Sequence, residues 1–174
     1  MGLSEDTIQS DLYIAKHIFY DDKGKDAWHR NPQLLNMCAY HCEQAIEKTL
    51  KLFLQSINED AYRSVANSHN ISELLVKMQC NSENFIENHK ELAHNADTIT
   101  KMNNLRYGVG EVSKNDCYIV LSNAKSLFAE YQKIYGKEHI RTISSLDGNK
   151  HKQTEADNSK KVNFTMKRIG SERD

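Results

Sequence analysis

The segment from Leu34 to Gln55, LLNMCAYHCEQAIEKTLKLFLQ, combines an apolar stripe with polar and charged side chains at helical spacing. His41, Gln44 and Lys48 follow one another at intervals of three and four residues, so they line one flank of a helix. A histidine titrates near neutrality and can carry a proton, and a lysine can contact a phosphate group. This flank therefore offers a proton carrier beside a phosphate contact.

A second charged flank lies next to the first and is formed by Glu43, Glu47 and Lys51. Glu47 and Lys51 stand four residues apart, in the order that favours an ion pair along a helix. Such pairs on a solvent-facing surface contribute only about 0.3–0.5 kcal/mol each. The residues alone leave two interpretations open, a functional site or a solvated helix face.

The same segment places Cys38, His41 and Cys42 within about one helical turn. A structural zinc ion needs four ligands, usually with a second pair at set spacing, and the sequence has no such pair. Both cysteines also fall on the apolar stripe, where a thiol behaves as a small hydrophobic group. We therefore predict no metal site and no cofactor.

Composition narrows the class of protein. The chain has 174 residues, 39% of them hydrophobic, which suffices for one core, and its formal net charge is -1. The charge is far from the basic footprint of a protein that holds nucleic acid by charge alone. No apolar run approaches the ~18 residues that span a bilayer, and the N-terminal sequence lacks the pattern of a signal peptide. We expect a cytoplasmic protein without membrane contact.

A single proline, few glycines and long apolar repeats of period 3.6 predict an all-α fold. The pattern gives long helices over about residues 4–20, 32–56, 82–105 and 113–136, with one short helix that starts near residue 70. Together they predict an up-and-down four-helix-type bundle with one extra short helix, formed by residues 1–136. Residues 137–174 are polar and without period, so we expect a flexible C-terminal tail.

Motifs in three parts of the chain resemble those of the HEPN family, the "higher eukaryotes and prokaryotes nucleotide-binding" domain. They are YHCEQAIEKTLKLFL, SHNISELL and LRYG, in that order, and DLYIAKHIF also resembles the first helix of the family. The resemblance covers about residues 10–135. The matching positions are Tyr40, His41, Gln44, Ala45, Glu47, Lys48, His69, Leu74, Leu75, Arg106 and Tyr107.

This resemblance implies a helical bundle that commonly dimerises and holds a nucleotide or RNA in a cleft. Many family members are toxins or defence proteins, and some are paired with a minimal nucleotidyltransferase, so we expect such a partner and a homodimer. The implied nucleotide-binding residues are His41, Gln44, Lys48, Arg106 and Tyr107. An alternative for Arg106 is a cation that stabilises a helix C-terminus, and an alternative for Tyr107 is packing at that helix end.

Another subset of the family consists of metal-independent endoribonucleases. These share a motif on a late helix, in which four to six residues separate an Arg from a His. Here no histidine follows Arg106 until His139. Arg63 and His69 have five residues between them, but they lie in the predicted connection before the short helix. Candidates for catalysis are therefore limited to His41, Arg63 and His69, and the sequence favours a binding protein over an enzyme. A non-catalytic oligomerisation scaffold is a third interpretation.

Apolar residues outside the main stripes support the expected homodimer. Ile14, Ile18, Met37 and Leu54 do not fall on the stripes that the helices use to cover one another. A second copy of the chain would cover them.

Overall fold

The computed structural model of the protein describes residues 3–20, 31 and 33–136. The described residues up to 132 belong to one compact unit, called the first unit below, and residues 133–136 fall outside it. All helices below belong to the first unit, apart from the last two residues of α8. Pro32, the predicted start of the second helix, and the predicted tail lie outside the described residues, so the expected domain boundary stays a prediction.

The first two helices begin next to residues whose side chains cap them. Helix α1 (Glu5–Phe19) follows Ser4, whose side chain accepts a hydrogen bond from the amide of Thr7. Helix α3 (Gln33–Ile57) follows Asn31, whose Oδ1 accepts from the amide of Gln33 at 3.1 Å. In both cases a side-chain oxygen satisfies an amide that the helix itself leaves without a partner.

The segment after α3 contains a helix that the sequence pattern did not predict. Helix α4 (Glu59–Val65) is capped by Asn58, so Arg63 lies on a helix and not in a connection. Helix α5 (Ile71–Asn81) then begins after Asn70, near the predicted start, and the side chain of Asn70 accepts a hydrogen bond from the amide of Glu73. His69 lies between these two helices.

The continuous helix predicted over residues 82–105 is wrong. Asn84 takes a left-handed conformation with φ of 60°, which separates α5 from the short helix α6 (Phe85–Asn88). Helix α7 (Lys90–Met102) follows, and a 3-10 helix η1 (Asn103–Tyr107) ends at Gly108 with φ of 73°. Within the predicted range the helix is interrupted at His89, between α6 and α7, where φ of -122° and ψ of 40° lie outside the helical region although the apolar period continues.

The last helix, α8 (Lys114–Ile134), starts at Ser113, whose Oγ accepts from the amide of Asp116 at 3.1 Å. It packs against α3 at both of its ends. The thiol of Cys117 reaches the carbonyl of Leu35 at 3.8 Å, and the rings of Phe53 and Tyr131 meet edge to face at 5.2 Å.

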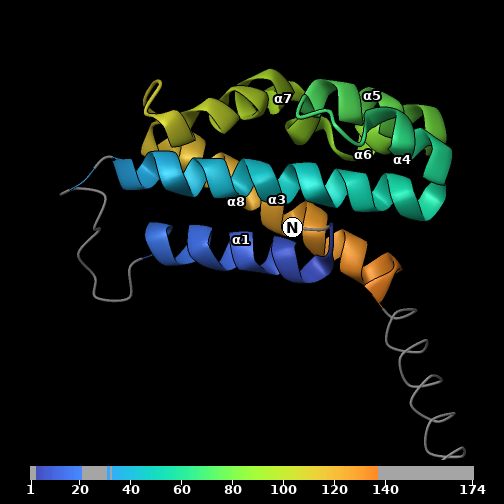
Figure 1. Cartoon of the computed structure of the whole chain (residues 1–174), viewed down its shortest axis with the longest axis horizontal. Coiled ribbons are helices and arrows are strands. Elements are labelled where there is room, and N and C mark those ends of the chain that lie inside the picture. The colour runs from blue at the N-terminus through green and yellow to red at the C-terminus, as the bar shows by residue number, and fades with distance from the viewer. Residues whose placement is uncertain (1–2, 21–30, 32, 137–174) are drawn as a thin grey trace, which may run out of the picture. The chain divides into compact units, whose positions relative to one another are not determined.

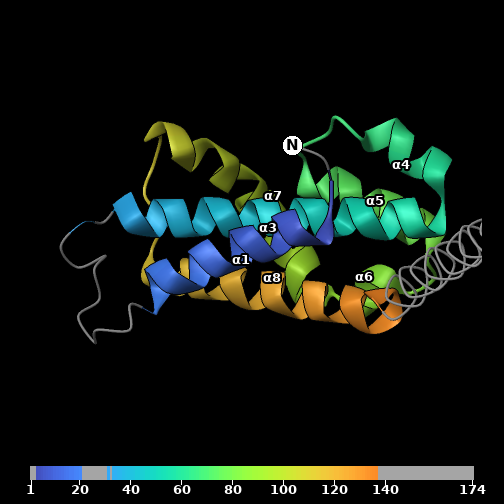
Figure 2. The same ribbon diagram turned by 60° about the horizontal axis from the view of Figure 1, so that its bottom comes forward.

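Helix α3 is the central element of the first unit. Figure 1 shows it between α1 on one side and α5 and α7 on the other, and Figure 2 shows α8 alongside it. Most of its residues are buried, including Ala45, Ile46 and Leu50, none of which is exposed. The predicted all-α bundle is confirmed, and the described residues contain no strand.

Two details of the surface bear on the predicted dimer. Leu54, which the sequence pattern left uncovered, is fully buried because α3 is covered on nearly all sides. Ile14 and Met37 remain 38% and 48% exposed.

No helix in the described part of the chain is long and apolar enough to cross a membrane.

Candidate functional site

The first charged flank of α3 meets α1 at a single carboxylate. Asp11 accepts from His41 Nδ1 at 2.8 Å through one oxygen and from Lys48 Nζ at 2.6 Å through the other. Because a carboxylate only accepts, Nδ1 of His41 carries the proton. We call Asp11, His41 and Lys48 the α1–α3 cluster.

The side chains of the α1–α3 cluster are largely but not fully buried, with 12% of Asp11, 18% of His41 and 26% of Lys48 exposed. Burial by itself would raise the pKa of Asp11. The hydrogen bonds and charges of His41 and Lys48 outweigh that effect and lower the pKa below its ordinary value of 3.8. The Asp11 carboxylate is therefore ionised, and its contacts with His41 and Lys48 connect α1 to α3.

The second charged flank is buried, so its interpretation as a solvated helix face is wrong. Glu43 is 0% exposed, Glu47 4% and Lys51 6%. Glu47 accepts from Lys51 Nζ at 2.8 Å and, through its other oxygen, from His69 Nδ1 at 2.8 Å. We call Glu43, Glu47, Lys51 and His69 the inner row.

His69 connects the inner row to solvent. Its side chain is 62% exposed, whereas that of Glu47 is 5% exposed. The Glu47 carboxylate holds the proton on Nδ1 and thereby leaves Nε2 as an acceptor. A buried acid thus fixes the tautomer of an exposed imidazole.

Glu43 is the least compensated group of the inner row. Gln44 donates to its Oε2 at 2.9 Å, and its Oε1 has no hydrogen-bond partner within the described residues. Burial, reinforced by the charge of Glu47, raises the pKa of Glu43 to about 8. At neutral pH this carboxyl group is therefore mostly protonated and neutral.

Arg106 lies at the surface beside two aromatic rings. Its guanidinium carbon is 4.5 Å from the ring centroid of Tyr107 and 5.6 Å from that of Tyr40. Its Nη1 also donates to the hydroxyl of Tyr40 at 3.4 Å. Tyr107 is 68% exposed, so it does not pack into the helix end. We call Tyr40, Arg106 and Tyr107 the arginine–tyrosine group.

The five predicted nucleotide-binding residues fall into separate contacts. His41 and Lys48 share Asp11, Gln44 binds Glu43, and Arg106 stacks with Tyr107. Glu43 links the last two groups electrostatically, because the charge of Arg106 lowers its pKa against the effect of burial. Their role in binding stays a prediction.

Sequence reasoning missed Asp11 and Glu43. Asp11 sits between Ile8, Leu12 and Ala15 on the buried stripe of α1, and an acid on an apolar stripe is the signal that could have revealed it. Glu43 gives no such signal, because its burial depends on which neighbours cover α3.

The candidates for catalysis contact different partners. Arg63 pairs with Glu59 on the exposed face of α4, whereas His69 binds the buried Glu47. Groups of three or more potential metal ligands are absent from the part of the chain that the structure describes.

The fold is that of an all-α helical bundle, and its central helix α3 carries two groups of internal polar residues, the α1–α3 cluster and the inner row. The particular family follows from comparison with known proteins. The family model for the HEPN domain matches residues 29–134, and the chain belongs to this family. The match begins after α1, so the similarity of α1 to a first HEPN helix stays a prediction. Comparison with curated proteins and with solved structures gives no match.

Proposed function

We propose that this HEPN protein binds a nucleotide or RNA through the arginine–tyrosine group. The observation that carries the proposal is an exposed guanidinium that forms no ion pair within the described residues and lies 4.5 Å from the exposed ring of Tyr107. An arginine forms charge-assisted hydrogen bonds with phosphate oxygens, and a tyrosine can stack a base. The two together match the chemistry of one nucleotide unit.

The protonation of Glu43 supports this assignment. The charge of Arg106 acts on Glu43, so an ionised Glu43 would compete with a phosphate for the guanidinium. Since burial raises the pKa of Glu43 to about 8, the carboxyl group is mostly neutral at pH 7 and leaves the charge of Arg106 available.

The other predicted binding residues contribute less. Lys48 and His41 already bind the Asp11 carboxylate, so a phosphate would have to displace that carboxylate to reach either side chain. Gln44 donates to Glu43. We therefore expect Arg106 and Tyr107 to dominate the affinity.

The proposal includes partners that rest on the family. The protein would act as the HEPN component of a toxin–antitoxin system or of a minimal nucleotidyltransferase pair, and it would form a homodimer. The 48% exposure of Met37 is consistent with a protein contact. Light scattering tests the dimer, and a monomer of 20.0 kDa at micromolar concentration would contradict it.

Fluorescence anisotropy with labelled single-stranded RNA tests the binding function. Each base stacked on an aromatic side chain contributes about 1–3 kcal/mol, so Tyr107→Ala should weaken binding roughly fivefold or more. Arg106→Ala should weaken it as well and lower the slope of log K against log salt by about 0.7, the value for one phosphate on a single strand.

Two control variants make this test specific. Lys101→Ala removes an exposed cation from α7 and should leave affinity and salt slope nearly unchanged. Lys48→Ala should weaken binding less than Arg106→Ala does. If Arg106→Ala and Tyr107→Ala bind RNA as the unaltered protein does, the arginine–tyrosine group is not the binding site.

One observation favours a second function, a metal-independent endoribonuclease. The exposed imidazole of His69 is oriented by the buried Glu47, an arrangement that leaves Nε2 free to accept a proton. The same RNA samples, analysed for cleavage with EDTA present, decide between the functions. Cleavage that His69→Ala abolishes and Arg106→Ala only weakens would establish the enzyme, and intact RNA would exclude it.

A further inference from the structure

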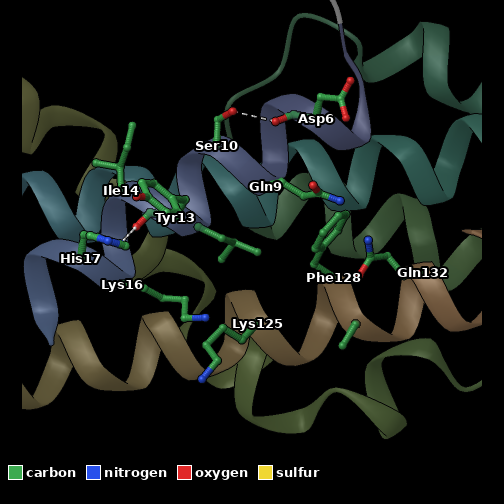
Figure 3. A pocket seen from close by; sticks show the side chains of 12 residues that line it. Asp6, Gln9, Ser10, Tyr13, Ile14, Lys16, His17, Lys125, Phe128 and Gln132 are labelled. Atoms are coloured by element: carbon green, nitrogen blue, oxygen red, sulfur yellow. Dashed lines mark hydrogen bonds between the residues drawn. The ribbon is translucent and has the colours of Figure 1, made fainter. Parts of the chain in front are cut away.

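A groove on the surface of the first unit lies between α1 and α8 and shares none of its lining residues with the arginine–tyrosine group, the α1–α3 cluster or the inner row. Its volume is about 1000 Å³. Its lining includes, on each helix, residues spaced by three or four positions, which lie on one face of that helix. The residues on which the argument rests are Gln9, Tyr13 and Lys16 on α1 and Lys125, Phe128 and Gln132 on α8 (Figure 3).

The two helices run antiparallel along this groove. Gln132 Nε2 donates to Glu5 at one end, and the rings of Phe19 and Tyr118 lie 6.1 Å apart at the other. The groove therefore has two distinct ends. Asp6 and Gln132 line the end near the start of α1, and Lys16 and Lys125 line the opposite end.

The middle of the groove is apolar. Phe128 and Leu12 form its floor and are 5% and 9% exposed. Tyr13 and Ile14 line it as well and are 63% and 38% exposed, which is high for large apolar side chains. The ring of Tyr13 lies against that of His17, with the centroids 4.0 Å apart and the planes tilted by 32°.

The lysine end carries uncompensated positive charge. Neither Lys16 nor Lys125 forms an ion pair with any acid in the described ranges, although Figure 3 shows both side chains at the same end of the groove. Asp6, the carboxylate of the lining, lies at the far end, more than two helical turns along α1 from Lys16. An apolar channel with two cations at one end complements a molecule that has an apolar body and an anionic head.

We propose that the α1–α8 groove binds an amphiphilic anion, with its apolar body against Phe128 and Tyr13 and its anionic head between Lys16 and Lys125. Fatty acids and aryl carboxylates share this chemistry. The site is independent of the proposed RNA site, because its lining residues are different and its pattern of charges and apolar groups is different.

Fluorescence titration of the full chain with anilinonaphthalene sulfonate tests the groove. This probe has an aromatic body and one anionic head, and phenylnaphthylamine is its neutral counterpart. Exposed ion pairs contribute about 0.2–1 kcal/mol each, so the double variant Lys16→Ala with Lys125→Ala should weaken the sulfonate probe roughly two- to thirtyfold. Binding of the neutral probe should change by less than about twofold, because that probe has no anionic head to lose an ion pair.

Two further variants locate the effect. Ala129 is exposed and lines the groove, so Ala129→Phe should fill it and weaken both probes without disturbing the core. The double variant Lys77→Ala with Lys101→Ala removes two lysines from α5 and α7 and should leave both probes unaffected. Melting curves by circular dichroism establish that each variant is folded.

Competition then identifies the ligand class. Displacement of the sulfonate probe by laurate assigns a fatty acid, and displacement by naphthoate assigns an aryl carboxylate. Stronger displacement by AMP than by either would overturn the proposal in favour of a nucleotide. Equal loss of the probe in both double lysine variants, or a groove that is covered by a second copy of the chain and binds neither probe, would overturn it too.

Discussion

The two charged flanks of α3 use similar residues and solve the problem of burying charge differently. In the α1–α3 cluster one carboxylate faces a lysine and a histidine, and its two oxygens are each paired. In the inner row two carboxylates face one buried lysine, and the histidine is mostly exposed. The second carboxyl group, that of Glu43, is mostly protonated and neutral at pH 7, since burial raises its pKa to about 8. The contributions of these two adjacent flanks to the stability of the protein therefore change with pH in opposite directions.

Burial also determines how much stability is lost when one member of an ion pair is removed. Removing one member of a buried pair leaves a charge without compensation, which costs more than losing a partly exposed pair. The side chains of Lys51 and Glu47 are 7% and 5% exposed, whereas those of Lys48 and Asp11 are 26% and 12% exposed. The two lysines are thus a matched pair for comparing the flanks.

The largest effect is expected from Lys51→Met. This change leaves the buried Glu47 carboxylate without its ammonium partner, and the free energy of unfolding should fall by about 3–5 kcal/mol. Urea denaturation at pH 7 measures it. Lys48→Met in the α1–α3 cluster is the control and should cost only about 1 kcal/mol, because the Lys48–Asp11 pair is partly exposed and water can solvate the remaining carboxylate. Equal losses would mean that burial does not distinguish the flanks.

A smaller, pH-dependent effect is expected from Glu43→Gln. Because the pKa of Glu43 is raised from 4.5 to about 8, the folded state binds a proton that the unfolded state releases between these values. The unaltered protein therefore loses stability as the pH rises from 4.5 to about 8, by an amount on the order of a few kcal/mol. Glu43→Gln lacks this loss. The stability of the variant relative to the unaltered protein should rise between pH 4.5 and about pH 8, and a difference independent of pH would contradict the raised pKa.

The smallest effect, with the opposite pH response, is expected from Asp11→Asn. The pKa of Asp11 is lowered from 3.8, so its ionised form stabilises the folded protein at all pH values above 3.8. At pH 7 the variant should be less stable by about 1–2 kcal/mol. This difference should shrink as the pH falls below 3.8 and Asp11 takes up a proton. Thermal melts at several pH values measure it, and a difference that widens in acid would show that Asp11 is not the partner of His41 and Lys48.

The sequence predicted the helices well where a local signal marked their ends. Ser4, Asn70 and Ser113 each cap the helix that follows them, and Gly108 ends η1. It failed at α4, which is too short for a clear apolar period, and at His89, which divides the predicted helix into α6 and α7. A single residue outside the helical region interrupts hydrogen bonding along the backbone without changing the spacing of the apolar side chains.

The candidate site was predictable only in part. His41, Gln44 and Lys48 do lie on one flank of α3, because three and four residues separate neighbours on any helix. Their partners were not predictable. Asp11 lies thirty residues before His41, and the burial of Glu43 depends on elements that follow α3 in the chain.

The sequence by itself determined the helical class, the central amphipathic helix and the HEPN motifs, because all of these depend on residue spacing within short segments. The tertiary structure alone decided which charges are buried, which acid pairs with which cation and where the α1–α8 groove lies. Burial, and with it the pKa of Glu43, depends on how segments far apart in the chain cover α3. No local pattern contains that information, since the same Glu43 on an uncovered helix would be solvated and ionised.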